Sequence, residues 1–261
     1  MFDPALASRC IFCLEDASTA PSVAHVISES LIEGAPTLPQ GAECDRCNNR
    51  LSKVEAKFMN DYLGAVTRVI DLEKTKKGRP PSARWEGSSI QAVDAPDGRR
   101  TIQIRLPGPP PASFDPAHAT VEIPLPSEKP VVASRFMCKA GIEALRYFEF
   151  PSVFDARLDT ARGFAIDPKP GVFIPYAWRL PNQDPSGFSV TECANLSPEF
   201  AVPLIIIDVP GLVLATVLVP MPQAKPFLDT ASASGWRVRD SPKKPKDQVF
   251  RINLQRPPRS D

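Results

Sequence analysis

Two Cys-x-x-Cys pairs constrain the fold of this chain more than any other feature of its sequence. The first pair is Cys10 and Cys13, and the second is Cys44 and Cys47, with 30 residues between them. Each pair can supply two thiolates, and four thiolates complete a tetrahedral structural zinc site. Two disulfides or four core thiols are the alternatives. We expect no secretion signal, since the chain begins Met-Phe-Asp-Pro, and disulfides are then disfavoured.

Length and composition predict a globular chain with one compact body or two small ones. The 261 residues include 43% hydrophobic and 23% charged side chains, which excludes a wholly disordered or fibrous protein. Proline is abundant, at 31 residues, and each proline removes a backbone donor, so long helices are excluded where prolines cluster. We predict three regions: a cysteine-bearing domain over residues 1–79, a Pro-rich accessory domain over 80–236 and a basic tail over 237–261.

The predicted fold class is α+β, with one strong helix in the cysteine-bearing domain and a mainly β body that holds one or two helices. Apolar residues recur at steps of three and four from Leu51 to Val69, which is typical of an amphipathic helix, and Gly64 is the expected place for a break. A second helix is expected over 134–148, hairpins over 88–106 and 204–219, and an edge strand over 248–254.

The most apolar stretch of the chain, residues 202–220, is interrupted by Pro203, Asp208, Pro210 and Gly211. A membrane-spanning helix needs about 20 consecutive apolar residues, which this stretch does not provide. We therefore expect a soluble, cytoplasmic protein that does not contact a membrane.

A formal net charge of +1 excludes a polycation built to coat nucleic acid, so any such binding must come from a local patch. Arg46, Arg50, Lys53 and Lys57 lie on or beside the start of the first predicted helix, and the last three form a stripe suited to phosphates. The first 79 residues carry ten Lys or Arg against eleven Asp or Glu. This balance predicts weak or partner-assisted binding of DNA, with RNA as the second possibility, and a solvated helix face is the alternative.

One of the two histidines lies between the cysteine pairs. His25 belongs to a run of strand character from Ser22 to Ile27, and Asn48 directly follows the last cysteine at the start of the predicted helix. If one zinc ion holds both pairs, the intervening segment folds back over the helix start and brings His25 towards Asn48. An imidazole with an unperturbed pKa of about 6.5 suits a general base at neutral pH. An inert, half-buried histidine is the alternative.

These residues resemble the HNH endonuclease family in its ββα-metal type with a four-cysteine zinc site. The resemblance covers roughly residues 8–60, and it rests on the cysteine pairs, on His25-Val-Ile-Ser-Glu-Ser-Leu31 and on Asn48-Asn-x-Leu51-Ser52. The layout of the Pro-rich body also looks like that of uncharacterised bacterial HNH proteins. The resemblance implies a structural Zn²⁺ on the cysteines, His25 as general base and Asn48 as a ligand of a catalytic Mg²⁺ or Mn²⁺. The implied activity is hydrolysis of DNA phosphodiester bonds, leaving 5′-phosphate and 3′-hydroxyl ends.

Ala24 departs from the family pattern. Many of these nucleases carry a metal-binding acidic residue or histidine just before the general base, and alanine cannot bind metal. Glu29 and Glu55 are candidate replacements, and Glu55 can share one helix face with Asn48. Two other functions therefore stay open: an inactive zinc-binding module that binds nucleic acid or a protein partner, and a zinc-stabilised interaction domain unrelated to nucleic acid. A homodimer is a further alternative.

Overall fold

The computed structural model describes residues 7–32, 34–71, 80–85, 88–94, 100–105, 114–115, 120–124, 128–179, 189–193, 204–209, 212–243 and 249–253. Within these ranges the helices are α1 (Asp45–Phe58), α2 (Tyr62–Asp71), α3 (Pro130–Tyr147), α4 (Asp159–Ile166) and α5 (Lys225–Ala233). The strands are β1 (Ser82–Trp85), β2 (Ser88–Asp94), β3 (Arg100–Arg105), β4 (Phe114–Asp115), β5 (Thr120–Pro124), β6 (Tyr176–Arg179), β7 (Ser189–Cys193), β8 (Leu204–Val209), β9 (Leu212–Thr216), β10 (Arg237–Arg239) and β11 (Val249–Asn253). This mixture of helix and sheet confirms the α+β class.

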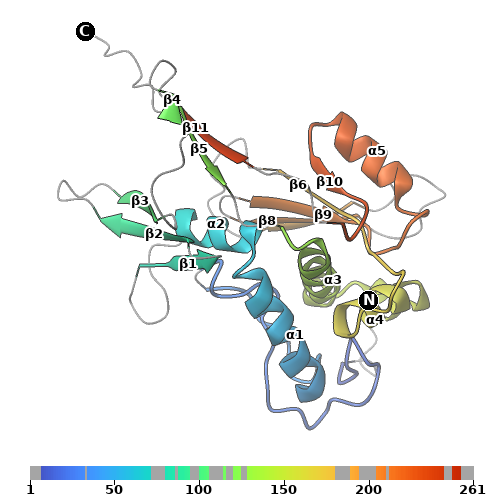
Figure 1. The fold of residues 1–261 in the computed structure, drawn as a ribbon. Coiled ribbons are helices and arrows are strands. Elements are labelled where there is room, and N and C mark those ends of the chain that lie inside the picture. Colours follow the sequence, from blue (N-terminus) through green and yellow to red (C-terminus); the bar gives the residue numbers. More distant parts are fainter. Residues whose placement is uncertain are drawn as a thin grey trace.

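The strands form three antiparallel sheets around the helices (Figure 1). The largest has the order β10-β6-β9-β8-β7, and the two smaller sheets are β1-β2-β3 and β11-β5-β4. Helix α3 packs against β8 and β9, and α5 packs against β10 and β6. The pairings β2–β3 and β8–β9 confirm both predicted hairpins, whose turns lie outside the described residues, and β11 confirms the predicted edge strand.

The prediction of one or two helices in the body was wrong, because α3, α4 and α5 all follow residue 80. Two 3-10 turns, Pro151–Phe154 and Ala156–Leu158, precede α4 where strands and loops were expected. Helix α4 spans eight residues, so its apolar periodicity covers little more than two turns and gives a weak sequence signal. Burial of Ala161, Phe164 and Ala165 in the core, which the local sequence does not show, stabilises it.

The single long helix predicted from Leu51 to Val69 is two helices, and the break lies before Gly64 rather than at it. Helix α1 ends at Phe58, and α2 begins at Tyr62. The Asp61 N–H donates to the Phe58 carbonyl at 2.9 Å, and the buried Asp61 carboxylate accepts the Lys129 N–H at 2.9 Å. A long-range contact to the residue before α3 therefore fixes the turn between α1 and α2.

Gly64 has a packing role in α2. A Cβ at this position would overlap the Phe58 carbonyl group, so only glycine allows the end of α1 to lie this close to α2. We expect Gly64→Ala to lower the free energy of unfolding by about 2–3 kcal/mol, as overpacking does. Gly163→Ala in α4 is the matched control, because a Cβ there meets no atom within 4 Å. That substitution should stabilise the protein by about 0.5–1 kcal/mol. Equal denaturation midpoints for the two variants would contradict this account.

The cysteine-bearing segment shares one hydrophobic core with the body. The cluster that includes Cys10, Ile27 and Leu51 continues into α3, α4, β8 and β9. At its centre the rings of Phe58 on α1 and Phe136 on α3 stack with their centroids 3.9 Å apart. The domain boundaries at residues 79 and 236 stay predictions. No helix in the described ranges combines the length and apolarity that crossing a membrane requires.

Candidate metal centre and the adjoining polar cluster

The four predicted zinc ligands come together. The sulfur atoms of Cys10, Cys13, Cys44 and Cys47 all lie within 4.8 Å of one another, and the Sγ atoms of Cys13 and Cys44 are 3.7 Å apart. In a tetrahedral zinc–thiolate site with bonds of about 2.3 Å, neighbouring sulfurs are separated by about 3.8 Å. The donor set and its spacing therefore fit a structural zinc ion.

The electrostatics of the cluster favour a bound cation. Hydrogen bonding from the Cys47 thiol lowers the pKa of Cys10 to about 4, while the same contact and burial raise the pKa of Cys47. Ionisation of the Cys10 thiol thus opposes ionisation of the Cys47 thiol. The Arg46 guanidinium lies beside Cys13, which raises the pKa of the arginine. A divalent cation would offset the repulsion among four thiolates more fully than this single exposed guanidinium.

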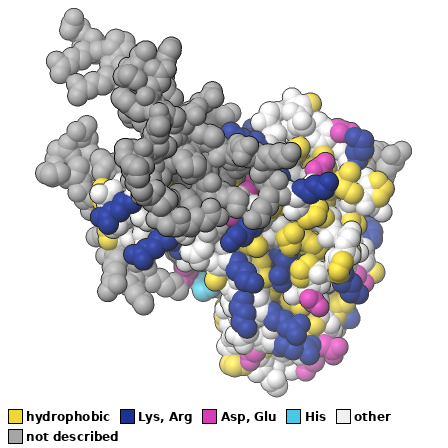
Figure 2. Space-filling view, in the orientation of Figure 1, with side chains coloured by type: hydrophobic (Ala, Val, Ile, Leu, Met, Phe, Trp, Pro, Cys, Tyr) yellow, Lys and Arg dark blue, Asp and Glu magenta, His cyan; other side chains and the backbone are white. Residues whose placement is uncertain are grey.

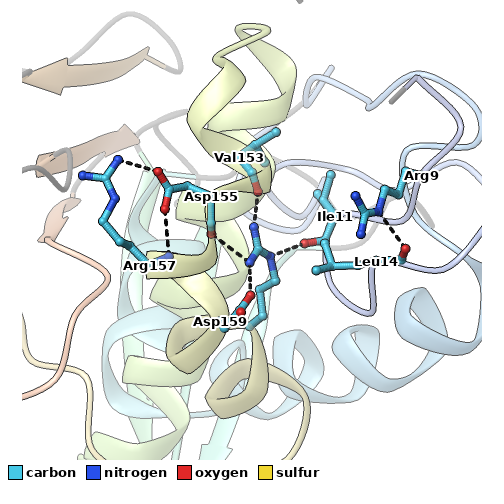
Figure 3. A network of polar contacts seen from close by, with 8 residues as sticks. Arg9, Ile11, Leu14, Val153, Asp155, Arg157 and Asp159 are labelled. Atoms are coloured by element: carbon cyan, nitrogen blue, oxygen red, sulfur yellow. Dashed lines mark hydrogen bonds and ion pairs between the residues drawn. The ribbon is translucent and has the colours of Figure 1, made fainter. Parts of the chain in front are cut away.

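Backbone contacts hold the first cysteine pair against the start of the second. The Ile11 N–H donates to the Ala42 carbonyl at 3.0 Å, two residues before Cys44. On the other side, the Ile11 carbonyl accepts a hydrogen bond from Arg162 Nε at 2.9 Å. The buried Arg162 guanidinium also donates to the Val153 and Asp155 carbonyl groups and to the Asp159 carboxylate. Figure 3 shows these contacts together with the one to Ile11. An arginine of α4 therefore helps to place the first pair of thiolates.

Asp45, in the first turn of α1, holds the segment that leads to His25. Its carboxylate accepts hydrogen bonds from the N–H and the hydroxyl group of Ser22. The strand predicted over Ser22–Ile27 is reduced to one bridge, His25 with Thr37, flanked by the contacts of Val26 N–H with the Pro36 carbonyl and Leu38 N–H with the Ala24 carbonyl. Pro36 has no N–H to return a hydrogen bond to the Val26 carbonyl, so the ladder is interrupted at this pair. Over residues 7–32 and 34–44, which the structure describes, no regular strands form the ββ part of the expected ββα module.

The imidazole of His25 faces a carboxylate and solvent. Its Nε2 atom lies 3.1 Å from Glu29 Oε1, and the side chain is 33% exposed. Ala24 is buried and therefore faces the core, so the position before His25 offers no ligand. The Glu29 candidate for the missing ligand is thus engaged with the imidazole itself.

Beneath His25 lies a buried polar cluster that combines one lysine with several glutamates. Lys139 Nζ, on α3, donates to the His25 carbonyl at 2.9 Å and contacts Glu143 Oε2 at 2.6 Å and Glu55 Oε1 at 3.6 Å. Burial raises the pKa of Glu143 and raises that of Glu43 to about 7, while Lys139 opposes both shifts. Burial thus disfavours the ionised form of these carboxyl groups, and the Lys139 ammonium group is the nearby charge that offsets this penalty.

A hard-cation site does not assemble from the described donors. The four cysteines are the only group of three or more His, Cys, Asp or Glu ligand atoms close enough to hold an ion in the described part of the chain. Glu55, the predicted ligand, is ion-paired with Lys139. Asn48 lies half-buried in the first turn of α1, where its N–H donates to the Cys44 carbonyl at 3.0 Å.

The predicted basic stripe lies on the other side of α1 from Asn48. With 3.6 residues per turn, Arg50, Lys53 and Lys57 fall on one side of the buried Leu51–Phe58 face, and Asn48 and Glu55 fall on the opposite side. Figure 2 shows Lys and Arg side chains gathered over α1. A groove of about 640 Å³ beside them is lined by Lys53, Ala56, Lys57, Asn60, Lys129 and Val132, and a second of about 280 Å³ by Arg50, Lys53, Val54, Lys57, Arg135, Ile166 and Asp167.

Sequence patterns missed Lys139, Glu143 and Arg162. The first two form an i,i+4 pair within a largely apolar helix, which is a signal for a buried ion pair, but the contact of Lys139 with residue 25 spans 114 positions. Comparisons with protein-family models, curated proteins and solved structures found no match.

Proposed function

We propose that this protein is an HNH-type endonuclease that hydrolyses DNA phosphodiester bonds with His25 as the general base. The observation that supports the proposal best is the placement of His25. Its imidazole meets Glu29 at 3.1 Å while one third of the side chain stays exposed, and its segment is tied to the first turn of α1, which carries Cys47 and Asn48. A carboxylate hydrogen-bonded to one ring nitrogen orients the imidazole and selects the tautomer whose other nitrogen can accept a proton.

In the proposed reaction His25 takes a proton from the water that attacks the phosphate. The attack displaces the 3′ oxygen and leaves 5′-phosphate and 3′-hydroxyl ends, as the resemblance to the family implies. That resemblance also assigns Mg²⁺ or Mn²⁺ to Asn48 and a carboxylate. The contact of Glu55 with Lys139 and the buried side chain of Ala24 do not fit that assignment.

The proposal places nucleic acid on the basic stripe and its grooves. The three stripe residues, Arg50, Lys53 and Lys57, are exposed, and Lys129 also lines the larger groove. Arg46, by contrast, lies beside the cysteine cluster. Cations placed along one helix face are suited to successive phosphates of a strand.

Removing two of these cations should weaken DNA binding in a salt-dependent way. For Lys53→Ala/Lys57→Ala, we expect the slope of log affinity against log salt to become less steep by about 2, since each phosphate contact contributes about 0.9. Fluorescence anisotropy with a labelled duplex in EDTA measures this without cleavage. Lys225→Ala/Lys243→Ala, which removes two exposed lysines elsewhere, is the control and should leave the slope unchanged. An equal change in both variants would exclude a specific role for the stripe.

A second candidate function is a zinc-binding module that binds nucleic acid or a protein partner without cleaving. Ala24 and the Lys139–Glu55 contact favour it, because both remove expected ligands of the catalytic metal. A plasmid-nicking assay in Mg²⁺ and in Mn²⁺, combined with metal analysis, separates the two functions. Nicking supports the nuclease. Intact plasmid in both metals, with zinc as the sole bound metal, supports the module.

A further inference from the structure

Lys139 is buried where α3 meets the cysteine-bearing segment. Only 3% of its side chain is exposed, and its ammonium group lies between α3, on which it resides, and the segment that carries His25. An ammonium group removed from water must be paired and hydrogen-bonded, because burying an isolated charge is costly. Here Glu143 supplies the opposite charge at 2.6 Å, and the His25 carbonyl accepts a hydrogen bond at 2.9 Å.

This arrangement restrains the peptide of His25 rather than its imidazole. The local pairing of His25 is one bridge with Thr37 and two flanking hydrogen bonds, and no regular strand in the described residues extends it. Helix α3 is held rigidly, because Phe136 stacks on Phe58 and the flanking residues Cys138 and Ala140 are fully buried. A hydrogen bond from such a helix fixes the position of the carbonyl, and the imidazole is then directed towards Glu29.

We propose that Lys139, held by Glu143, is a positioning residue for His25. The inference rests on the proposed function for its catalytic consequence, but the contact itself is independent of that function. It makes the candidate active site composite, since the general base comes from the cysteine-bearing segment and its positioning group from the body. A misplacement of about 1 Å at a reacting group can cost about 10²-fold in rate.

Nuclear magnetic resonance of the full-length zinc-loaded protein tests the placement directly. The chain has two histidines, so its imidazole signals form two sets, and His25→Ala identifies the set of His25. In Lys139→Met/Glu143→Gln, which removes both charges together, we expect the His25 signals to shift or broaden while those of His118 stay in place. The control is Lys225→Met, which breaks an exposed i,i+4 pair with Asp229 and should leave both sets unchanged.

Kinetics add a second readout. For the double variant we expect kcat to fall by about 10²-fold with KM within about twofold, and Lys139→Arg, which keeps the charge and donors, should recover part of the loss.

Unchanged His25 signals in a folded double variant that retains zinc would overturn the proposal. If the double variant does not fold, the His25 signals of Lys139→Arg test the proposal instead. Arginine has a longer, planar donor group, so the His25 signals must move in this variant if the contact positions the residue. Shifted His25 signals in a protein that cleaves no DNA would support the positioning role and reject the nuclease.

Discussion

Replacing Cys47 with serine is expected to release zinc and to unfold the cysteine-bearing segment. Cys47 is buried, and it lies in the first turn of α1. Structural zinc sites contribute roughly 10–16 kcal/mol of binding free energy, which is comparable to the total stability of a typical domain. We therefore expect the free energy of unfolding to fall by more than about 4 kcal/mol. Circular dichroism in denaturant, together with elemental analysis for zinc, measures both effects.

Cys138→Ala provides the matched control for this prediction. Cys138 is as buried as Cys47 but lies on α3 outside the sulfur cluster, where burial raises the pKa of its thiol. Its replacement should leave about one zinc ion per chain and cost only the small destabilisation of a shortened core side chain. Full zinc content and wild-type stability in Cys47→Ser would contradict a zinc role for the cluster.

His25→Ala is expected to reduce plasmid nicking by about 10²–10⁴-fold, the usual contribution of a general base. The substitution removes an imidazole that is one third exposed, and the His25 carbonyl remains available to Lys139, so the fold should persist. Supercoiled-to-nicked conversion on an agarose gel, at matched zinc content, gives the rate.

His118→Ala is the control for this rate, because it removes the other histidine of the chain. His118 lies outside the described residues, and we expect its replacement to leave nicking unchanged. An unaltered rate in His25→Ala would exclude His25 as the base and would point to another catalytic group or to a contaminating nuclease. Loss of activity in both variants at equal protein stability would show that nicking also depends on His118, and a role confined to His25 would then be wrong.

Local patterns were reliable where one short segment contains the whole signal. The periodicity of Leu51, Val54 and Phe58 predicts the buried face of α1, and the paired β-branched runs predict the β8–β9 hairpin. The same reasoning missed α4, because eight residues carry too little periodicity. It also located the helix break at Gly64, whereas the turn is fixed by Asp61 and its contact with Lys129.

For the candidate site, too, local spacing was predictive and long-range contacts were not. Spacing alone predicted that four sulfurs would meet, and they do. Spacing placed Glu55 beside Asn48 on α1, but it could not reveal that Lys139 engages Glu55 and the His25 carbonyl. The basic stripe was recognisable from its steps of three and four. Its position on the side of α1 away from Asn48 follows from which face the core buries.

The sequence by itself determined the elements whose causes are local: the cysteine spacing, the amphipathic face of α1 and the β-branched runs of the paired strands β8 and β9. The tertiary structure alone decided how the two halves of the chain meet. Lys139 and Arg162 are ion-paired with Glu143 and Asp159 on their own helices, and they complete their hydrogen bonds at the carbonyl groups of His25 and Ile11, more than a hundred residues away. Such pairings leave no trace in local periodicity, because they satisfy an energetic requirement that arises only once the core has formed.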